Sequence, residues 1–98
     1  MNSSVRFHPD AEAETSEAAA FLEPESPGLG LAFLDDFEHA IEVIVSHPEV
    51  APILQGRVRR KVLRKFPYSI IYSVVGDEIR ILAVCHQHRR PFYWQSRR

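Results

Sequence analysis

Residues 68–86, which read YSIIYSVVGDEIRILAVCH, decide the fold. Two runs rich in β-branched and aromatic residues, 68–75 and 78–86, stand on either side of Gly76 and Asp77. A glycine followed by an aspartate between two such runs is typical of a tight β-hairpin. We therefore expect the two runs to pair as antiparallel strands and the rest of the fold to assemble around them.

Upstream of this hairpin the pattern changes between strand and helix. We expect a strand at 57–66 that joins the hairpin as a meander, a short first strand at 5–8, and helices at 10–23 and 29–47. The chain ends in a basic and aromatic tail, 87–98, which has no clear period. The order β-α-α-β-β-β predicts an α+β fold, in which a helical hairpin packs on one face of a small, mainly antiparallel sheet.

The second helix has the clearest periodicity. Apolar residues recur along one side of it at helical spacing: Phe33, Phe37, Ile41 and Ile44. Acidic residues occupy the other side, so the helix is amphipathic. It should end before Pro48, because the residue that precedes a proline is displaced from the α region. This helix is expected to bury its apolar side against the sheet.

The two faces of the sheet should differ in character. Strict alternation turns one set of last-strand residues toward the helices: Ile79, Ile81, Ala83 and Cys85. The opposite, outer face collects apolar residues that do not suit contact with water: Ile71, Val75, Leu82 and Val84. Either the tail covers this outer face or another chain docks on it. We favour a docked partner, because the tail is too short to cover the whole sheet.

Composition limits the classes of protein to consider. The 98 residues, of which 45% are hydrophobic and 26% charged, predict a single folded domain over 1–98. No apolar run approaches the ~20 residues of a membrane span, and the first residues lack the layout of a secretory signal. Cys85 is the one cysteine and cannot close an internal disulfide, which fits a reducing compartment. We expect a cytoplasmic protein with no membrane role.

Two segments resemble a known family. Residues 59–72, RRKVLRKFPYSIIY, and 79–91, IRILAVCHQHRRP, resemble the toxins of type II toxin–antitoxin modules from the RelE/ParE superfamily, and its plasmid-stabilisation members in particular. Residues 7–14, FHPDAEAE, resemble the opening of the same family, and the expected helix ending at His47 and Pro48 matches it too. The resemblance covers nearly the whole chain and implies the same fold.

The resemblance also implies a small bacterial protein that a tightly bound antitoxin neutralises. Two activities occur on this fold, and neither implies a cofactor. RelE-like members bind the ribosome and cut messenger RNA, whereas ParE-like members bind DNA gyrase and poison it without chemistry of their own. A fold alone does not choose between two such activities, so the choice depends on the site.

Cleavage of RNA without a metal needs a base, an acid and cations that stabilise the charged transition state. The candidate catalytic residues for a RelE-like activity are Lys61, His86, Arg89 and Tyr93. Tyr93 lies where RNA-cutting relatives carry a functional tyrosine, but Ser69 and Gln87 stand where such relatives often carry arginines. We therefore favour the ParE-like branch and keep a RelE-like ribonuclease and a non-toxic binding remnant as alternatives.

A metal site was also considered. His86 and His88 alternate along a strand, next to Cys85, and two imidazoles on one face can converge on zinc. Cys85 should point the other way, and no second pair of ligands follows at a recognised spacing. We expect no metal.

Charge is strongly divided along the chain. Residues 1–50 hold one basic and eleven acidic side chains, and residues 51–98 hold eleven basic and two acidic ones. The basic half therefore suits an acidic, amphipathic antitoxin segment. Candidate partner-binding residues are Arg59, Arg60, Arg64, Ile71, Val75, Leu82, Val84, Arg90 and Trp94. A homodimer and a toxin–antitoxin hetero-oligomer both remain open.

Overall fold

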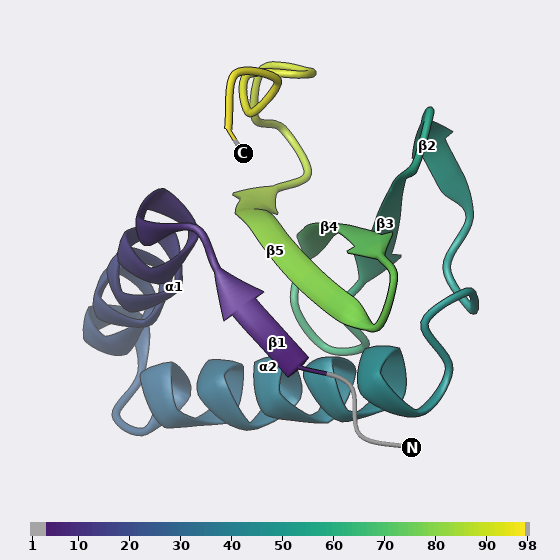
Figure 1. Ribbon diagram of the computed structural model, residues 1–98. Helices are drawn as coiled ribbons and strands as arrows, with labels where there is room; N and C mark the ends of the chain where they lie inside the picture. Colours follow the sequence, from purple (N-terminus) through teal and green to yellow (C-terminus); the bar gives the residue numbers. More distant parts are fainter. Residues whose placement is uncertain (1–3, 98) are drawn as a thin grey trace.

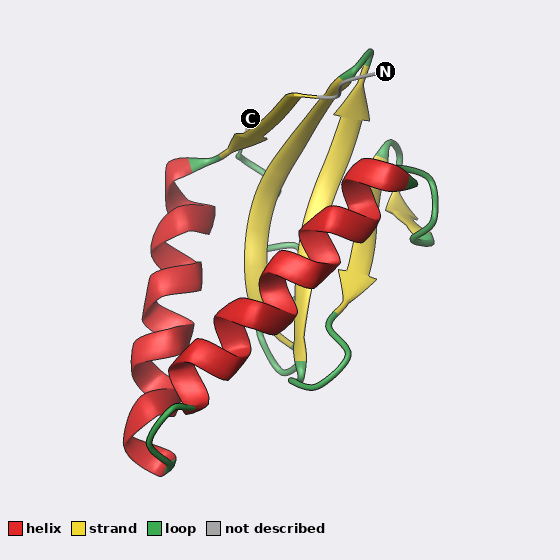
Figure 2. Ribbon diagram, turned by 90° about the horizontal axis from the view of Figure 1, so that it is seen from below, coloured by secondary structure: helices red, strands yellow, loops and turns green. Residues whose placement is uncertain are grey.

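The computed structural model describes residues 4–97 and has the expected α+β architecture, with both helices packed on one face of a five-stranded sheet (Figure 1, Figure 2). The elements are β1 (Ser4–Phe7), α1 (Pro9–Leu22), a 3₁₀ turn η1 (Glu23–Glu25), α2 (Leu29–Ser46), β2 (Ile53–Gln55), β3 (Val58–Val62), β4 (Tyr68–Val75) and β5 (Glu78–His86). The strand order is β1-β5-β4-β3-β2. β1 runs parallel to β5 and every other pair is antiparallel.

The two helices are joined by a tight, specific connection. The carboxylate of Glu23 accepts hydrogen bonds from the backbone N–H groups of Gly28 and Gly30, both at 2.9 Å, and so caps the start of α2. A Cβ atom at Gly30 would lie only 2.8 Å from the carbonyl oxygen of Ala19 in α1. Glycine at this position therefore lets the two helices approach closely.

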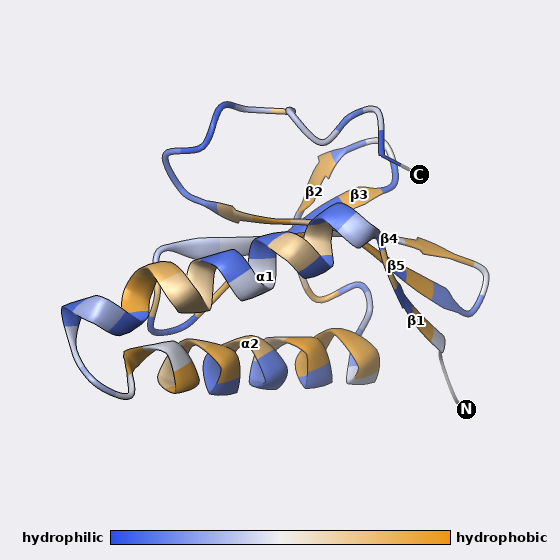
Figure 3. Ribbon diagram, turned by 90° about the vertical axis from the view of Figure 1, so that its left-hand side faces the viewer, coloured by the Kyte–Doolittle hydropathy of each residue, from blue (hydrophilic) through white to orange (hydrophobic). Residues whose placement is uncertain are grey.

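The main core lies between α2 and the central strands. Figure 3 shows hydrophobic and hydrophilic residues alternating along α2, as the sequence predicts. Phe33 is fully buried, and its ring lies 5.0 Å from that of Tyr68 and 5.6 Å from that of Phe66 (centroid to centroid). Ile44 and Tyr72 are also fully buried. Among residues 4–97, no helix is long and apolar enough to cross a membrane.

The sequence-based prediction for the third strand is wrong at both ends. The strand expected at 57–66 stops at Val62, because the chain then turns and the N–H of Lys65 donates to the buried carboxylate of Asp36 in α2 at 2.8 Å. The segment before it, expected to be a loop, contains β2, which pairs with the first residues of β3. The sheet therefore has one more strand than the sequence predicts.

The strict alternation expected for the last strand is also wrong. Ile71 faces Ala83, but the next residue of β4, Tyr72, faces Ile81, so Leu82 is an extra residue in β5. This bulge reverses the alternation beyond it. Ile79 and Ile81 pack toward the helices as expected, whereas Ala83 and Cys85 join the outer cluster of side chains and Val84 joins the main core.

The outer face of the sheet is covered by the protein's own C-terminal turn, residues 91–97, which Figure 3 shows on the opposite side of the sheet from α2. Trp94 is 4% exposed and packs with Ile71, Leu82 and Ala83. The expectation of an open apolar face is therefore wrong. A few tail residues suffice because one large indole covers the apolar centre of the face, while Val75, at its margin, stays 37% exposed.

Candidate partner-binding surface

Glu14 in α1 joins the C-terminal turn to the sheet. Its carboxylate accepts hydrogen bonds from the Tyr93 hydroxyl at 2.7 Å, from the Arg97 guanidinium at 2.8 and 3.1 Å, and from the backbone N–H of Val84 at 2.9 Å. Arg97 also donates to the carbonyl oxygen of Leu82 at 3.1 Å. We call Glu14, Tyr93, Arg97 and the amide of Val84 the Glu14 clasp.

The Glu14 clasp forms where β1 ends. The last pair between β1 and β5 is Phe7 with Ile81, so the N–H of Val84 lies beyond the reach of β1. Glu14 supplies the acceptor that a longer β1 would have supplied. The side chains of Glu14 and Arg97 are each only 12% exposed, so their ion pair is shielded from solvent. Such a pair fixes a defined arrangement of the tail rather than decorating the surface.

The clasp shifts the pKa values of its members. Burial raises the pKa of Glu14, but hydrogen bonds from Arg97, Val84 and Tyr93 outweigh burial and leave this pKa below its ordinary value of 4.5. Burial, followed by the hydrogen bond to Glu14, raises the pKa of Tyr93 far above its ordinary value. Tyr93 therefore keeps its proton at neutral pH and donates it to a carboxylate of its own chain.

The four candidate catalytic residues do not form one constellation. The guanidinium of Arg89 lies 4.0 Å from the ring centroid of Tyr93, so these two meet. His86 packs edge-on against the ring of Tyr68 in the main core, at 5.1 Å between centroids. Lys61 pairs with Ile70, a residue of the helix-facing core, and so lies on the opposite face of the sheet from the C-terminal turn. The geometry brings together Arg89 and Tyr93 alone.

Two of the arginines proposed to bind a partner have partners within the chain. Arg59 donates to the carbonyl oxygens of Glu49 at 3.1 Å and Ala51 at 2.7 Å, which holds the loop after α2 against β3. Arg64 lies 3.0 Å from the imidazole of His39 in α2. Arg59 is half-buried and Arg64 is exposed. Arg59 therefore has a structural role that the sequence pattern did not reveal.

The exposed cations gather around the C-terminal turn. Arg60, Arg89 and Arg90 are exposed and line a small hollow of about 120 Å³ between the outer face of the sheet and this turn. Arg60 also donates to the hydroxyl of Ser69 at 3.2 Å. Four of the apolar residues proposed to bind a partner are buried beside or beneath this surface: Ile71, Leu82, Val84 and Trp94. With the turn closed, cations and not apolar groups face solvent here.

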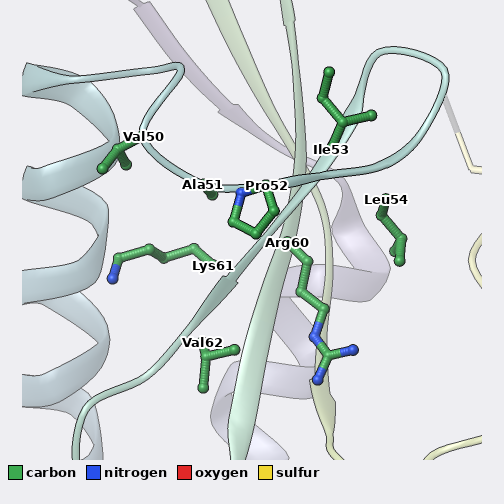
Figure 4. Close-up of a pocket in the computed structure, with 8 residues that line it drawn as sticks. All are labelled: Val50, Ala51, Pro52, Ile53, Leu54, Arg60, Lys61 and Val62. Carbon is green, nitrogen blue, oxygen red and sulfur yellow. The ribbon is translucent and has the colours of Figure 1, made fainter.

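A second, apolar surface lies at the edge of the sheet, and sequence reasoning missed it. We call it the edge hollow: a depression of about 440 Å³ lined by Val50, Ala51, Pro52, Ile53, Leu54, Arg60, Lys61 and Val62 (Figure 4). Val50, Ile53 and Val62 are each more than half exposed. The signal in the sequence is the presence of Val50, Ile53 and Leu54 in a stretch that otherwise reads as a polar, proline-containing loop.

The ring centroids of His86 and His88 lie 5.2 Å apart, and the Nδ1 atom of His86 accepts a hydrogen bond from the backbone N–H of His88 at 3.1 Å. Within residues 4–97, no group of three or more His, Cys, Asp or Glu side chains is placed to hold a metal ion.

Comparison with known proteins identifies the family. The family described as "ParE toxin of type II toxin-antitoxin system, parDE" matches residues 5–91. The chain belongs to the ParE toxin family. A solved structure titled "Chromosomal ParDE TA system from P. aeruginosa" is similar to this ParE-family chain with a TM-score of 0.75 and 20% sequence identity, over 86% of this chain and 95% of that one. This likeness supports the fold. No curated protein matches the chain significantly.

Proposed function

We propose that this ParE-family chain is a toxin that binds and poisons DNA gyrase in the bacterial cytoplasm and is neutralised by a cognate antitoxin. The observation that carries the proposal is the state of Tyr93, whose hydroxyl donates to Glu14 within the chain. Lys61 lies on the other face of the sheet. A ribonuclease needs its acid, base and cations around one phosphate, whereas a poison that acts by binding needs a surface.

The exposed cations support the same proposal. Arg60, Arg89 and Arg90 surround the C-terminal turn and are accompanied by Phe92, which is 39% exposed. Arginine and aromatic side chains are enriched among the residues that contribute most to protein–protein binding. This surface is therefore our candidate for contact with gyrase.

The decisive experiment measures supercoiling by purified gyrase in the presence of the wild-type chain and of Tyr93→Phe. We expect both proteins to inhibit supercoiling to a similar degree, because the phenol oxygen has no part in the chemistry. The same two proteins, added to a translation reaction, should leave messenger RNA intact. Trp94 emission checks that the substitution has not released the C-terminal turn.

Other outcomes point to the alternatives. Cleavage of messenger RNA that requires translation and disappears in Tyr93→Phe would establish the RelE-like activity instead. A wild-type chain that affects neither gyrase nor translation, and that is harmless when expressed without an antitoxin, would be a binding remnant of the family.

The divided charge predicts how the antitoxin associates. The basic half of the chain forms most of the sheet and the C-terminal turn, and the acidic half forms the helices. Raising the ionic strength from about 0.1 to 1 M shortens the screening length from ~10 to ~3 Å. We expect the association rate constant with an acidic antitoxin to fall over this range while the dissociation rate constant changes much less. Stopped-flow measurement of both constants tests this, and an association rate that ignores salt would contradict it.

A further inference from the structure

The exposed edge of the sheet is interrupted by a proline. β2 pairs with β3 through Ile53 with Arg59, and the N–H of Arg60 then donates to the carbonyl oxygen of Pro52 at 3.2 Å. In an antiparallel ladder the second residue normally returns a hydrogen bond. Pro52 has no N–H to return, so the carbonyl group of Arg60 is left facing the edge hollow.

The next outward-facing residue of β3 is Val62. The N–H of Leu63 donates to the carbonyl oxygen of Tyr68 at 2.9 Å, which directs the backbone of Leu63 toward β4. Backbone groups of successive strand residues point in opposite directions, so the N–H and C=O of Val62 point away from β4. Within residues 4–97 the pairing of β2 does not extend to Val62. Arg60 and Val62 thus offer an acceptor, a donor and a second acceptor in a row.

The side chains around this edge favour one kind of occupant. Val50, Ile53 and Val62 are 54%, 60% and 52% exposed, which is unusual for three neighbouring aliphatic residues. Lys61 lies among them and extends toward α2 in Figure 4. A lysine at a sheet edge repels basic chains and attracts acidic ones. The edge hollow therefore combines apolar contact area with a preference for negative charge.

We propose that the edge of β3 binds an extended peptide segment of a partner protein as an additional strand. The segment carries acidic side chains on the face shared with Lys61 and apolar side chains on the face shared with Val62, because alternate residues of a strand point to opposite faces. This inference rests on the proposed function in one respect: it assigns the segment to the antitoxin. The outer face beneath the C-terminal turn takes no part in it.

The test uses an eight-residue peptide of alternating valine and glutamate and the isotope-labelled chain. We expect the peptide, at about 1 mM, to slow amide hydrogen exchange at Val62 by about tenfold or more, as a hydrogen bond to this N–H requires. A peptide of alternating valine and lysine should have no such effect. Exchange that slows only at the C-terminal turn, or nowhere, would overturn the proposal.

Two variants separate the backbone from the side chain. Val62→Pro removes the N–H that faces the edge and leaves the hydrogen bonds between β3 and β4 in place, whereas Val62→Ala keeps the N–H and shortens the side chain. We expect the proline variant to lose peptide binding and the alanine variant to keep most of it. Equal binding by both variants and the wild type would contradict strand addition. Trp94 emission and the circular dichroism spectrum verify that each variant is folded.

The outcome does not depend on gyrase, which is absent from the binding reaction. If the chain binds the peptide at Val62 but leaves supercoiling unaffected, strand addition stands and the proposed target is wrong. If the chain inhibits gyrase but ignores the peptide, the reverse holds.

Discussion

Glu14→Ala is expected to release the C-terminal turn and to shift the fluorescence of Trp94, the single tryptophan, to longer wavelength. The substitution leaves three donors without their acceptor: the Tyr93 hydroxyl, the Arg97 guanidinium and the N–H of Val84. Loss of one partner from a shielded pair of charges leaves the other uncompensated. We expect a loss of about 3 kcal/mol in the free energy of unfolding, measured by urea titration.

Glu17→Ala is the matched control, because Glu17 belongs to the same helix but is exposed and accepts no hydrogen bond from the turn in residues 4–97. This variant should keep the wild-type emission spectrum and stability. If Glu14→Ala also keeps the wild-type spectrum, the clasp does not hold the turn.

Acid should act on the same group. The pKa of Glu14 lies below its ordinary value of 4.5 in the folded chain, so the clasp contributes its full stability above that value. The contribution is lost as the pH falls through the folded-state pKa. Trp94 emission should therefore shift as the pH is lowered from 5, and Glu14→Gln should shift it already at neutral pH.

Phe33→Ala should cost about 3–5 kcal/mol in the free energy of unfolding, because it empties a fully buried site in the main core. The ring contacts those of Phe66 and Tyr68, so the cavity would open where α2 meets the start of β4. A small domain has a total stability of about 5–15 kcal/mol. With a urea dependence of about 1–3 kcal/mol per molar, the unfolding midpoint should fall by roughly 2 M.

Leu31→Ala provides the comparison for this variant. Leu31 lies in the same helix but is 69% exposed, so its truncation should leave the midpoint nearly unchanged. Similar losses in the two variants would show that helix stability and not core packing is responsible.

The sequence predicts the arrangement of helices and strands well because that arrangement follows from local periodicity. The stripe of apolar residues in α2 and the turn at Gly76 and Asp77 each act over a few residues, and each appears in the structure as expected. The bulge at Leu82 has no such local signal, because an extra apolar residue in an apolar strand does not interrupt any pattern. One residue therefore exchanged the faces of Val84 and Cys85.

The candidate site was harder to predict because its contacts join distant parts of the chain. Glu14 is one of several acidic residues in α1, and nothing nearby distinguishes it from Glu12 or Glu17. Its role depends on Tyr93 and Arg97, which lie 79 and 83 residues away. The free edge of β3 likewise depends on which residue of the preceding loop lies opposite Arg60, and only the folded chain shows that it is a proline.

The separation of 83 residues between Glu14 and Arg97 also has a consequence for synthesis on the ribosome. Domains fold as their chain emerges, and a contact forms only after both of its residues have emerged. The helices and most of the sheet are complete before Arg97 is translated, so the nascent protein passes through a stage in which Ile71, Leu82 and Ala83 have no indole above them. A newly made chain is thus stickier than a finished one, and the last residues to be translated end that stage.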